Sequence, residues 1–225
     1  MPPIINPLMN LGIGSELIYS FIIILTSLII YFKTKELYEL SSYKGINYFR
    51  KAFLFFAAAY FFRVFIKFIL VYSEIDEIFY LSPQFAGLLT LFVFLYLSTM
   101  AMFYLIYSIT WKNQKIKLIY FHIISLVIPL LLIFLRQPLI YLGMNLLLLI
   151  LGVSLIYAAH NNIKKQGKNN GLYVIYSLLF SFWTLNIIDI LIPRFLQNTQ
   201  LIIYLLSLGI FITILYKVIS KTGSN

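Results

Sequence analysis

Long apolar stretches alternate with short polar connections along the chain. Each stretch is close to the roughly 20 residues that an α-helix needs to cross the hydrocarbon core of a bilayer. The connections are rich in Lys, Asn, Gly and Pro, which end helices or stay in water. We therefore predict seven transmembrane helices. They cover residues 17–32, 51–72, 85–111, 118–135, 139–159, 172–192 and 201–219.

Composition points to the bilayer as the solvent of this chain. Of its residues, 62% are hydrophobic and 11% are charged, whereas soluble domains carry about 25% charged residues. The expected fold class is all-α: a polytopic seven-helix bundle of the cell membrane that occupies residues 1–225 as a single domain. Between the first two spans, residues 33–50 are predicted to hold a short interfacial helix.

The distribution of Lys and Arg predicts the orientation of the bundle, because cytoplasmic loops carry an excess of these residues. The side opposite the C-terminus holds Arg136 and Arg194. We therefore expect an external N-terminus and a cytoplasmic C-terminus. The thirteen cations on the predicted cytoplasmic side are Lys33, Lys35, Lys44, Arg50, Lys51, Lys112, Lys115, Lys117, Lys164, Lys165, Lys168, Lys217 and Lys221.

A weak internal similarity suggests a repeat. Residues 17–32 align with residues 139–154, and each is followed by a loop that contains Gly and Lys. Two triplets of helices joined by the fourth span would give a parallel 3+1+3 repeat about an axis along the membrane normal. Chance alignment of two Leu- and Ile-rich helices is the alternative explanation.

The second predicted span carries two cations, Arg63 and Lys67. A Lys or Arg at the centre of a lipid-facing helix costs about 2.5–3.5 kcal/mol on insertion scales, so each needs a partner or water. A spacing of four residues places both side chains on one face of the helix. Intramembrane polar residues of this kind are candidates for a functional site.

Other polar residues are predicted at a similar depth in the outer half of the bundle. Asn186 and Asp189 share one face of the sixth span, Asn145 belongs to the fifth, and Glu16 lies at the outer mouth of the first. We predict an outward-facing polar cavity lined by these residues and walled by aromatic side chains. The predicted ligand-binding residues are Arg63, Lys67, Asn145, Asn186, Asp189, Glu16, Trp183, Tyr60 and Tyr19.

Two interpretations of this predicted site stay open. In one, Asp189 neutralises Lys67 or Arg63 in a structural ion pair and nothing else binds. In the other, the site binds a small ligand. Two cations facing one buried acid leave a surplus of positive charge, which favours an anionic ligand, although an outward reach of Lys67 to the headgroups would reduce that surplus.

The remaining polar residues of the spans are predicted to be structural. Tyr96, Ser98 and Thr99 are expected to form hydrogen bonds between helices. A lone histidine in an apolar helix, His122, is expected to pack against its neighbours.

Several function classes are excluded or disfavoured. The chain has no Cys and two His residues, so thiol chemistry is excluded and we expect neither a metal site nor a cofactor. Motifs of hydrolases, metalloproteases and phosphate-binding loops are absent from the sequence, so we do not expect an enzyme. The net charge of +10 comes from loops on one side of the membrane, which indicates topology rather than nucleic-acid binding.

One stretch carries a resemblance to a known class of membrane domain. The run KGINYFRKAFLFFAAAYFFRVF, residues 44–65, resembles the loop and second span of small prokaryotic seven-helix sensor-type domains, some of them fused to histidine kinases. The resemblance implies a receptor or sensor with a cytoplasmic signalling partner.

Two other heptahelical families are similar in architecture alone. SWEET/PQ-loop transporters share the 3+1+3 plan, but here Pro83-Gln84 lies in a loop and is not repeated. Microbial rhodopsins carry a retinal-binding Lys in the middle of the last span. Here Lys217 lies near the cytoplasmic end of that span, so retinal is not expected.

We therefore expect a receptor- or sensor-like membrane protein. It would bind a small, anionic ligand from outside and pass a signal to a cytoplasmic partner. One alternative is a small-solute transporter built from two helix triplets. Another is a structural subunit of a membrane complex without a ligand.

Overall fold

The computed structural model describes residues 7–76, 83–111, 117–135, 171–191 and 197–222, together with nine positions between 143 and 157. Each predicted apolar stretch that falls in these ranges is helical. The helices are α1 (Pro7–Ser41), α2 (Lys44–Asp76), α3 (Pro83–Thr110), α4 (Leu118–Leu135), α6 (Gly171–Leu191) and α7 (Gln197–Thr222). The described positions between 143 and 157 are also helical.

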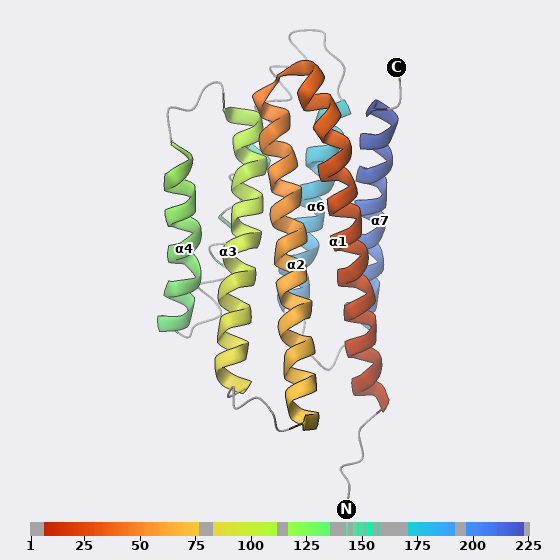
Figure 1. Cartoon of the computed structure of the whole chain (residues 1–225), viewed down its shortest axis with the longest axis vertical. Helices are drawn as coiled ribbons and strands as arrows, with labels where there is room; N and C mark the ends of the chain where they lie inside the picture. The colour runs from red at the N-terminus through yellow and green to blue at the C-terminus, as the bar shows by residue number, and fades with distance from the viewer. Residues whose placement is uncertain are drawn as a thin grey trace, which may run out of the picture.

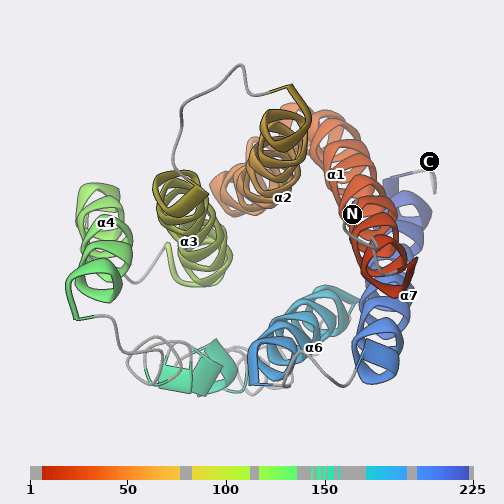
Figure 2. The ribbon, with the colours of Figure 1, turned by 90° about the horizontal axis from the view of Figure 1, so that it is seen from below.

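The helices stand side by side, with α1, α3 and α7 running in one direction and α2, α4 and α6 in the other (Figure 1). Seen from below, α4, α3, α2, α1, α7 and α6 follow one another around the bundle, and the described residues between 143 and 157 lie between α6 and α4 (Figure 2). No strand occurs in the described part of the chain. The expected all-α class is confirmed.

Within the described ranges, three helices are long and apolar enough to cross a bilayer: Gly14–Ser41, Phe92–Thr110 and Leu201–Ser220. The described apolar stretches of α4 and α6, Leu118–Leu131 and Val174–Leu185, are shorter. A helix that spans lipid satisfies its backbone hydrogen bonds internally, which is why apolar sequence and helical structure coincide here. The protein therefore associates with a membrane.

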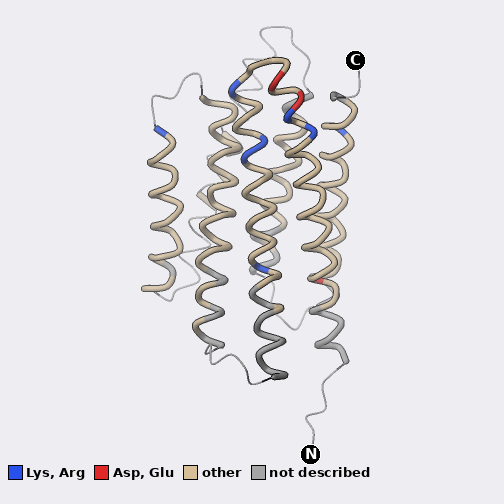
Figure 3. Tube along the Cα trace, in the orientation of Figure 1, with Lys and Arg blue, Asp and Glu red and all other residues tan. Residues whose placement is uncertain are grey.

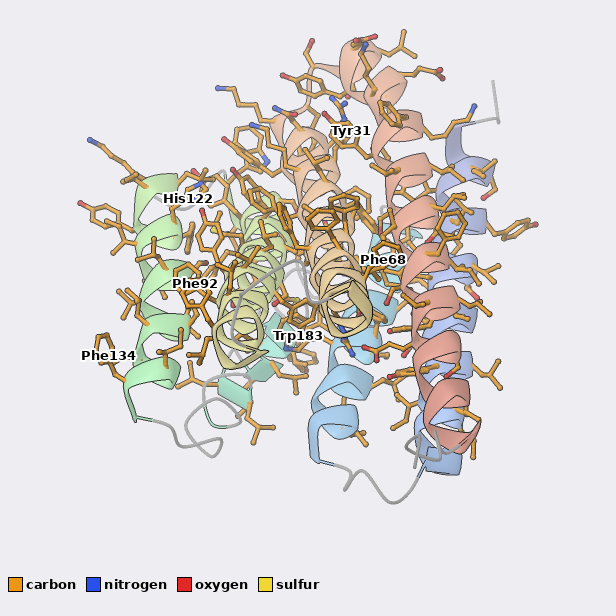
Figure 4. All side chains as sticks on the ribbon, turned by 60° about the horizontal axis from the view of Figure 1, so that its bottom comes forward. Tyr31, Phe68, Phe92, His122, Phe134 and Trp183 are labelled. Carbon is orange, nitrogen blue, oxygen red and sulfur yellow. The ribbon has the colours of Figure 1, made fainter. Side chains whose placement is uncertain are left out.

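Large apolar side chains also lie on the outer surface of the bundle. Phe134 of α4 is 80% exposed and points away from the other helices (Figure 4), and Leu205 of α7 is 68% exposed. A soluble protein does not leave such large side chains on every outward face. Lipid chains are the solvent that matches this surface.

Phenylalanine rings fill the middle of the bundle. Phe53 and Phe56 of α2 meet Phe182 of α6 and Phe211 of α7, with ring centroids 4.5 Å apart between Phe182 and Phe211 and 5.9 Å apart between Phe56 and Phe182. All four side chains are at most 1% exposed. Edge-to-face contacts of this kind stabilise aromatic pairs beyond their buried area, so α2, α6 and α7 form one packed core.

The prediction of a short interfacial helix between the first two spans is wrong. Instead, α1 continues without a break through the charged residues to Ser41, and the chain reverses at Ser42 and Tyr43 before α2 begins. Ser42 adopts a positive φ of 51°, which is the left-handed conformation that commonly ends a helix. Lys and Glu have good helix propensity, so charge alone does not end a helix that extends into water.

Gly45, in the first turn of α2, allows a close approach to the end of α3. A Cβ atom at this position would lie 2.5 Å from the Tyr43 ring and 2.8 Å from the backbone oxygen of Ser108. The Ser108 carbonyl belongs to the backbone of α3, so moving it aside would disturb that helix. A side chain at position 45 would therefore separate the α1–α2 turn from α3.

Positive charge is concentrated at one end of the bundle. In Figure 3 the Lys and Arg residues gather at the end that also holds the C-terminus, and one cation of α2 lies far from them along the helix. The acidic residues of α1 occupy both ends of that helix. This asymmetry agrees with the uneven distribution of cations in the sequence.

We predict that Gly45→Ala lowers the melting temperature of the detergent-solubilised protein, because overpacking against a backbone atom costs about 1–3 kcal/mol. Gly209→Ala in α7 is the matched control, since a Cβ there would meet no atom within 4 Å. That control should be neutral or slightly stabilising. Equal melting temperatures for the two variants would contradict the close packing at Gly45.

Candidate functional site

An ion pair joins α1 to α2 in the half of the bundle that lies away from the C-terminus. The Arg63 guanidinium donates from Nε to Oε1 of Glu16 at 2.8 Å, and its Nη2 lies 2.5 Å from the same oxygen. The two side chains are 19% and 14% exposed, respectively. The carboxylate of Glu16 therefore supplies the counter-charge that a cation inside a helix bundle requires.

Helical periodicity brings two tyrosines next to this ion pair. Tyr19 lies three residues after Glu16 and Tyr60 lies three residues before Arg63, so each shares a face with its charged neighbour. The Tyr19 and Tyr60 hydroxyl oxygens are 3.2 Å apart, and both side chains are almost fully buried. The antiparallel packing of α1 on α2 thus pairs charge with charge and hydroxyl with hydroxyl.

Aromatic rings surround the cation. The guanidinium carbon of Arg63 lies 5.3 Å from the ring centroid of Phe94 and 6.0 Å from that of Tyr60. Such contacts stabilise a cation, and more strongly where water is excluded. On the other side, Tyr19 stacks on Tyr204 of α7 with ring centroids 4.4 Å apart and planes inclined by 11°. The site therefore involves α1, α2, α3 and α7.

Trp183 of α6 lies inside the bundle near the same level. Its side chain is 5% exposed (Figure 4). The preceding residue, Phe182, lies 6.5 Å from Tyr60 between ring centroids. The indole Nε1 donates to no acceptor in the part of the chain that the structure describes.

The structure brings together four of the nine predicted site residues: Glu16, Arg63, Tyr19 and Tyr60. Trp183 is buried next to a residue that contacts Tyr60. The remaining predicted positions lie outside the described residues or have side chains that are not described: Lys67, Asn145, Asn186 and Asp189. A pairing of Asp189 with Lys67 or Arg63 thus stays a prediction, whereas the described partner of Arg63 is Glu16.

Two aromatic residues of the site were not predicted. Phe94 has no polar atom, so nothing in its sequence context distinguishes it from the neighbouring apolar residues of α3. Tyr204 carried a usable signal, because it lies near the outer end of the last span as Tyr19 does in the first. Only the contact between α1 and α7 makes the two rings partners.

Elsewhere in α3, a long polar side chain reaches the neighbouring helix, whereas short ones form hydrogen bonds within their own helix. The Tyr96 hydroxyl oxygen lies 2.9 Å from Nδ1 of His122, so Tyr96 bridges α3 and α4 as predicted. Ser98 and Thr99 instead donate to the backbone oxygen of Leu95 in their own helix, and the prediction that they link helices is wrong. Their short side chains reach the preceding turn more easily than the next helix.

The chemistry of the site suits an anion better than a metal. No three His, Asp or Glu residues gather as metal ligands within the described ranges. Arginine presents a planar fork of donors that matches a carboxylate and cannot be deprotonated in proteins. The arrangement can therefore hold an oxyanion against Arg63.

We predict that Glu16→Gln destabilises the protein by roughly 3 kcal/mol, because it leaves a largely buried guanidinium without its counter-charge. The double variant Glu16→Gln/Arg63→Gln should recover much of this loss, since no charge then remains unpaired. Thermal unfolding in detergent would measure both.

The exposed pair of Lys35 and Glu39, 3.6 Å apart, supplies the control. Exposed ion pairs contribute little, so Glu39→Gln should leave the melting temperature nearly unchanged. A Glu16→Gln variant as stable as Glu39→Gln would contradict the importance of the pair between α1 and α2.

Comparison with known proteins identifies a relative but no described family. No protein-family model matches the chain, and no solved structure matches it. An uncharacterized protein of Archaeoglobus fulgidus is 32% identical over an alignment of 229 positions, which includes 98% of this chain and 97% of the relative. Similarity at this level over nearly the whole of both chains shows common descent. The chain therefore belongs to the same family as this archaeal protein.

Proposed function

We propose that the protein is a seven-helix, multi-pass receptor or sensor of the cell membrane, with an external N-terminus and a cytoplasmic C-terminus. In this proposal a small anionic molecule enters from outside and binds at Arg63. The observation that carries it is the partly exposed ion pair of Arg63 and Glu16, with its surrounding aromatic rings.

The orientation is supported by the charge asymmetry. Cations gather at the end of the bundle that holds the C-terminus (Figure 3). Cytoplasmic ends of membrane helices carry such an excess. The ion pair would then lie in the outer half of the bundle, within reach of a molecule from outside.

Exchange of counter-ions offers a mechanism for sensing. The carboxylate of Glu16 and the oxyanion of a ligand compete for the same donors of Arg63. A ligand that displaces Glu16 would loosen the contact of α1 with α2 in their outer halves, while the turn at Ser42 and the contact at Gly45 keep them together at the other end. Differential affinity for the two states is what allows a ligand to shift such an equilibrium.

The displacement would reach a second helix through aromatic packing. Tyr19 follows Glu16 by less than one turn and stacks on Tyr204 of α7. Movement of α1 at Glu16 would therefore act on α7, whose C-terminal end is on the proposed cytoplasmic side. A cytoplasmic signalling partner would respond to that end of the bundle.

The packed core favours a receptor over a transporter. A transporter needs a path to its site from both sides of the membrane. Between the ion pair and the basic end, the core is filled by Phe53, Phe56, Phe182 and Phe211, all almost completely buried. A structural subunit without a ligand is favoured by one observation, namely that Glu16 already neutralises Arg63.

We predict that single cysteines report opposite sides of the membrane at the two ends of α1. The natural chain is free of Cys, so each substitution is the only thiol. In intact cells, Gly14→Cys should react with a membrane-impermeant maleimide, whereas Ser42→Cys should react only after the membrane is opened. The reverse pattern would contradict the proposed orientation.

We predict that small organic acids raise the melting temperature of the purified protein and that Arg63→Gln weakens their binding at least tenfold, as loss of a charge-assisted hydrogen bond would. Lys33→Gln, an exposed cation at the other end of the bundle, is the control and should bind normally. The probes are sodium acetate, lactate, malate and succinate at matched ionic strength. Absence of any stabilisation by these acids would overturn the receptor proposal in favour of a structural subunit.

A further inference from the structure

The indole of Trp183 is a buried donor that lacks an acceptor. Its side chain is 95% buried, since 5% of it is exposed. Its Nε1 finds no hydrogen-bond partner among the described residues. An unpaired polar group in an apolar interior is costly, and in a native structure it indicates a missing acceptor such as water or a ligand.

Trp183 lies at the level of the ion-pair site. Phe182 contacts both Tyr60 and Phe211, at centroid distances of 6.5 Å and 4.5 Å. Trp183 therefore lies near the depth of Tyr60. Arg63 is three residues further along α2, which corresponds to a rise of about 4.5 Å toward the outer end.

Two serines near this level, Ser20 of α1 and Ser207 of α7, are also buried and have hydroxyl groups without a partner in the described part of the chain. A serine can resolve this by turning its hydroxyl to a carbonyl of the preceding turn, as Thr26 does toward Ile22 at 2.7 Å. The indole has no such option, because its N–H direction is set by a rigid ring. Of these three residues, Trp183 is thus the one that most requires an external acceptor.

We propose that Trp183 is part of the ligand site and donates a hydrogen bond from Nε1 to a second acceptor of the bound anion. The inference rests on the proposed binding of an anion at Arg63 and specifies its class. The ligand is a small acid with two acceptor groups, namely a hydroxy acid, a keto acid or a dicarboxylate.

The chemistry of the two anchoring groups determines this class. The guanidinium and the indole N–H both donate and neither accepts. A ligand that satisfies both must offer oxygen acceptors at two places. Ammonium and other donor groups on the ligand would meet no complementary group at these two residues.

The chain contains two tryptophans, which makes the test direct. In a Trp111→Phe background, Trp183 is the only tryptophan, and Trp111 itself lies at the opposite end of the bundle, after α3. We expect malate, lactate and succinate to shift the emission maximum of Trp183, and acetate to leave it unchanged. Melting curves of the Trp111→Phe protein establish that it is folded.

The Trp183→Phe variant separates this inference from the proposed function. It should weaken binding of malate and succinate about fivefold to tenfold, the effect of one hydrogen bond, and leave acetate binding unchanged. Equal weakening for acetate and malate, or none for either, would overturn the role of Trp183 while binding that depends on Arg63 still supports the receptor. Loss of all acid binding from the natural protein would overturn both.

Discussion

A guanidinium inside a lipid-facing bundle imposes one requirement on the structure: an anion must lie next to it. Arg63 meets this requirement through Glu16, and the contact joins α1 to α2 in the half of the bundle away from the C-terminus. The neighbouring pair of Tyr19 and Tyr60 follows from the same register of the two helices. Removal of the charge from either partner would leave the other charge unpaired in an apolar environment, which strongly destabilises a folded protein.

The bundle has three chemically different zones along its length. The level of the ion pair, in the half away from the C-terminus, contains charge, hydroxyl groups and an indole donor. The middle contains phenylalanine rings in edge-to-face contact. The other end contains the basic residues, a tight turn at Ser42 and the close approach at Gly45. Under the proposed function, a polar zone separated from the basic end by a packed aromatic core suits recognition of a molecule better than its passage across the membrane.

The relation to the archaeal protein extends over nearly the full length of both chains. A shared ancestor of that length implies that the helical bundle as a whole, rather than one segment, is the inherited unit. The proposed site draws on four or more helices that are distant in sequence, from Glu16 to Tyr204. It therefore depends on the complete bundle and would not survive in an isolated part of it.

The sequence by itself determined the helical class and the association with a membrane. Apolar stretches of bilayer length allow only helices here, because backbone groups in lipid must pair within their own segment. It also identified Arg63, Glu16, Tyr19 and Tyr60 as candidates, since polar atoms in an apolar helix are conspicuous. Predictions from local pattern were wrong where the same residues fit two structures equally well. The charged residues after Phe32 continue α1 to Ser41 instead of forming a separate helix. Ser98 and Thr99 form hydrogen bonds within α3 instead of linking it to another helix.

Only the tertiary structure decided which groups meet. From the sequence, Asp189 was the predicted acid for Lys67 or Arg63 and Glu16 was predicted only to line the cavity, but the packing of α1 on α2 brought Glu16 to Arg63. Phe94 and Tyr204 joined the site because α3 and α7 pack beside these helices. Helix periodicity states which residues share a face, but the partner of that face depends on side-chain fit across the whole bundle, which no single segment contains.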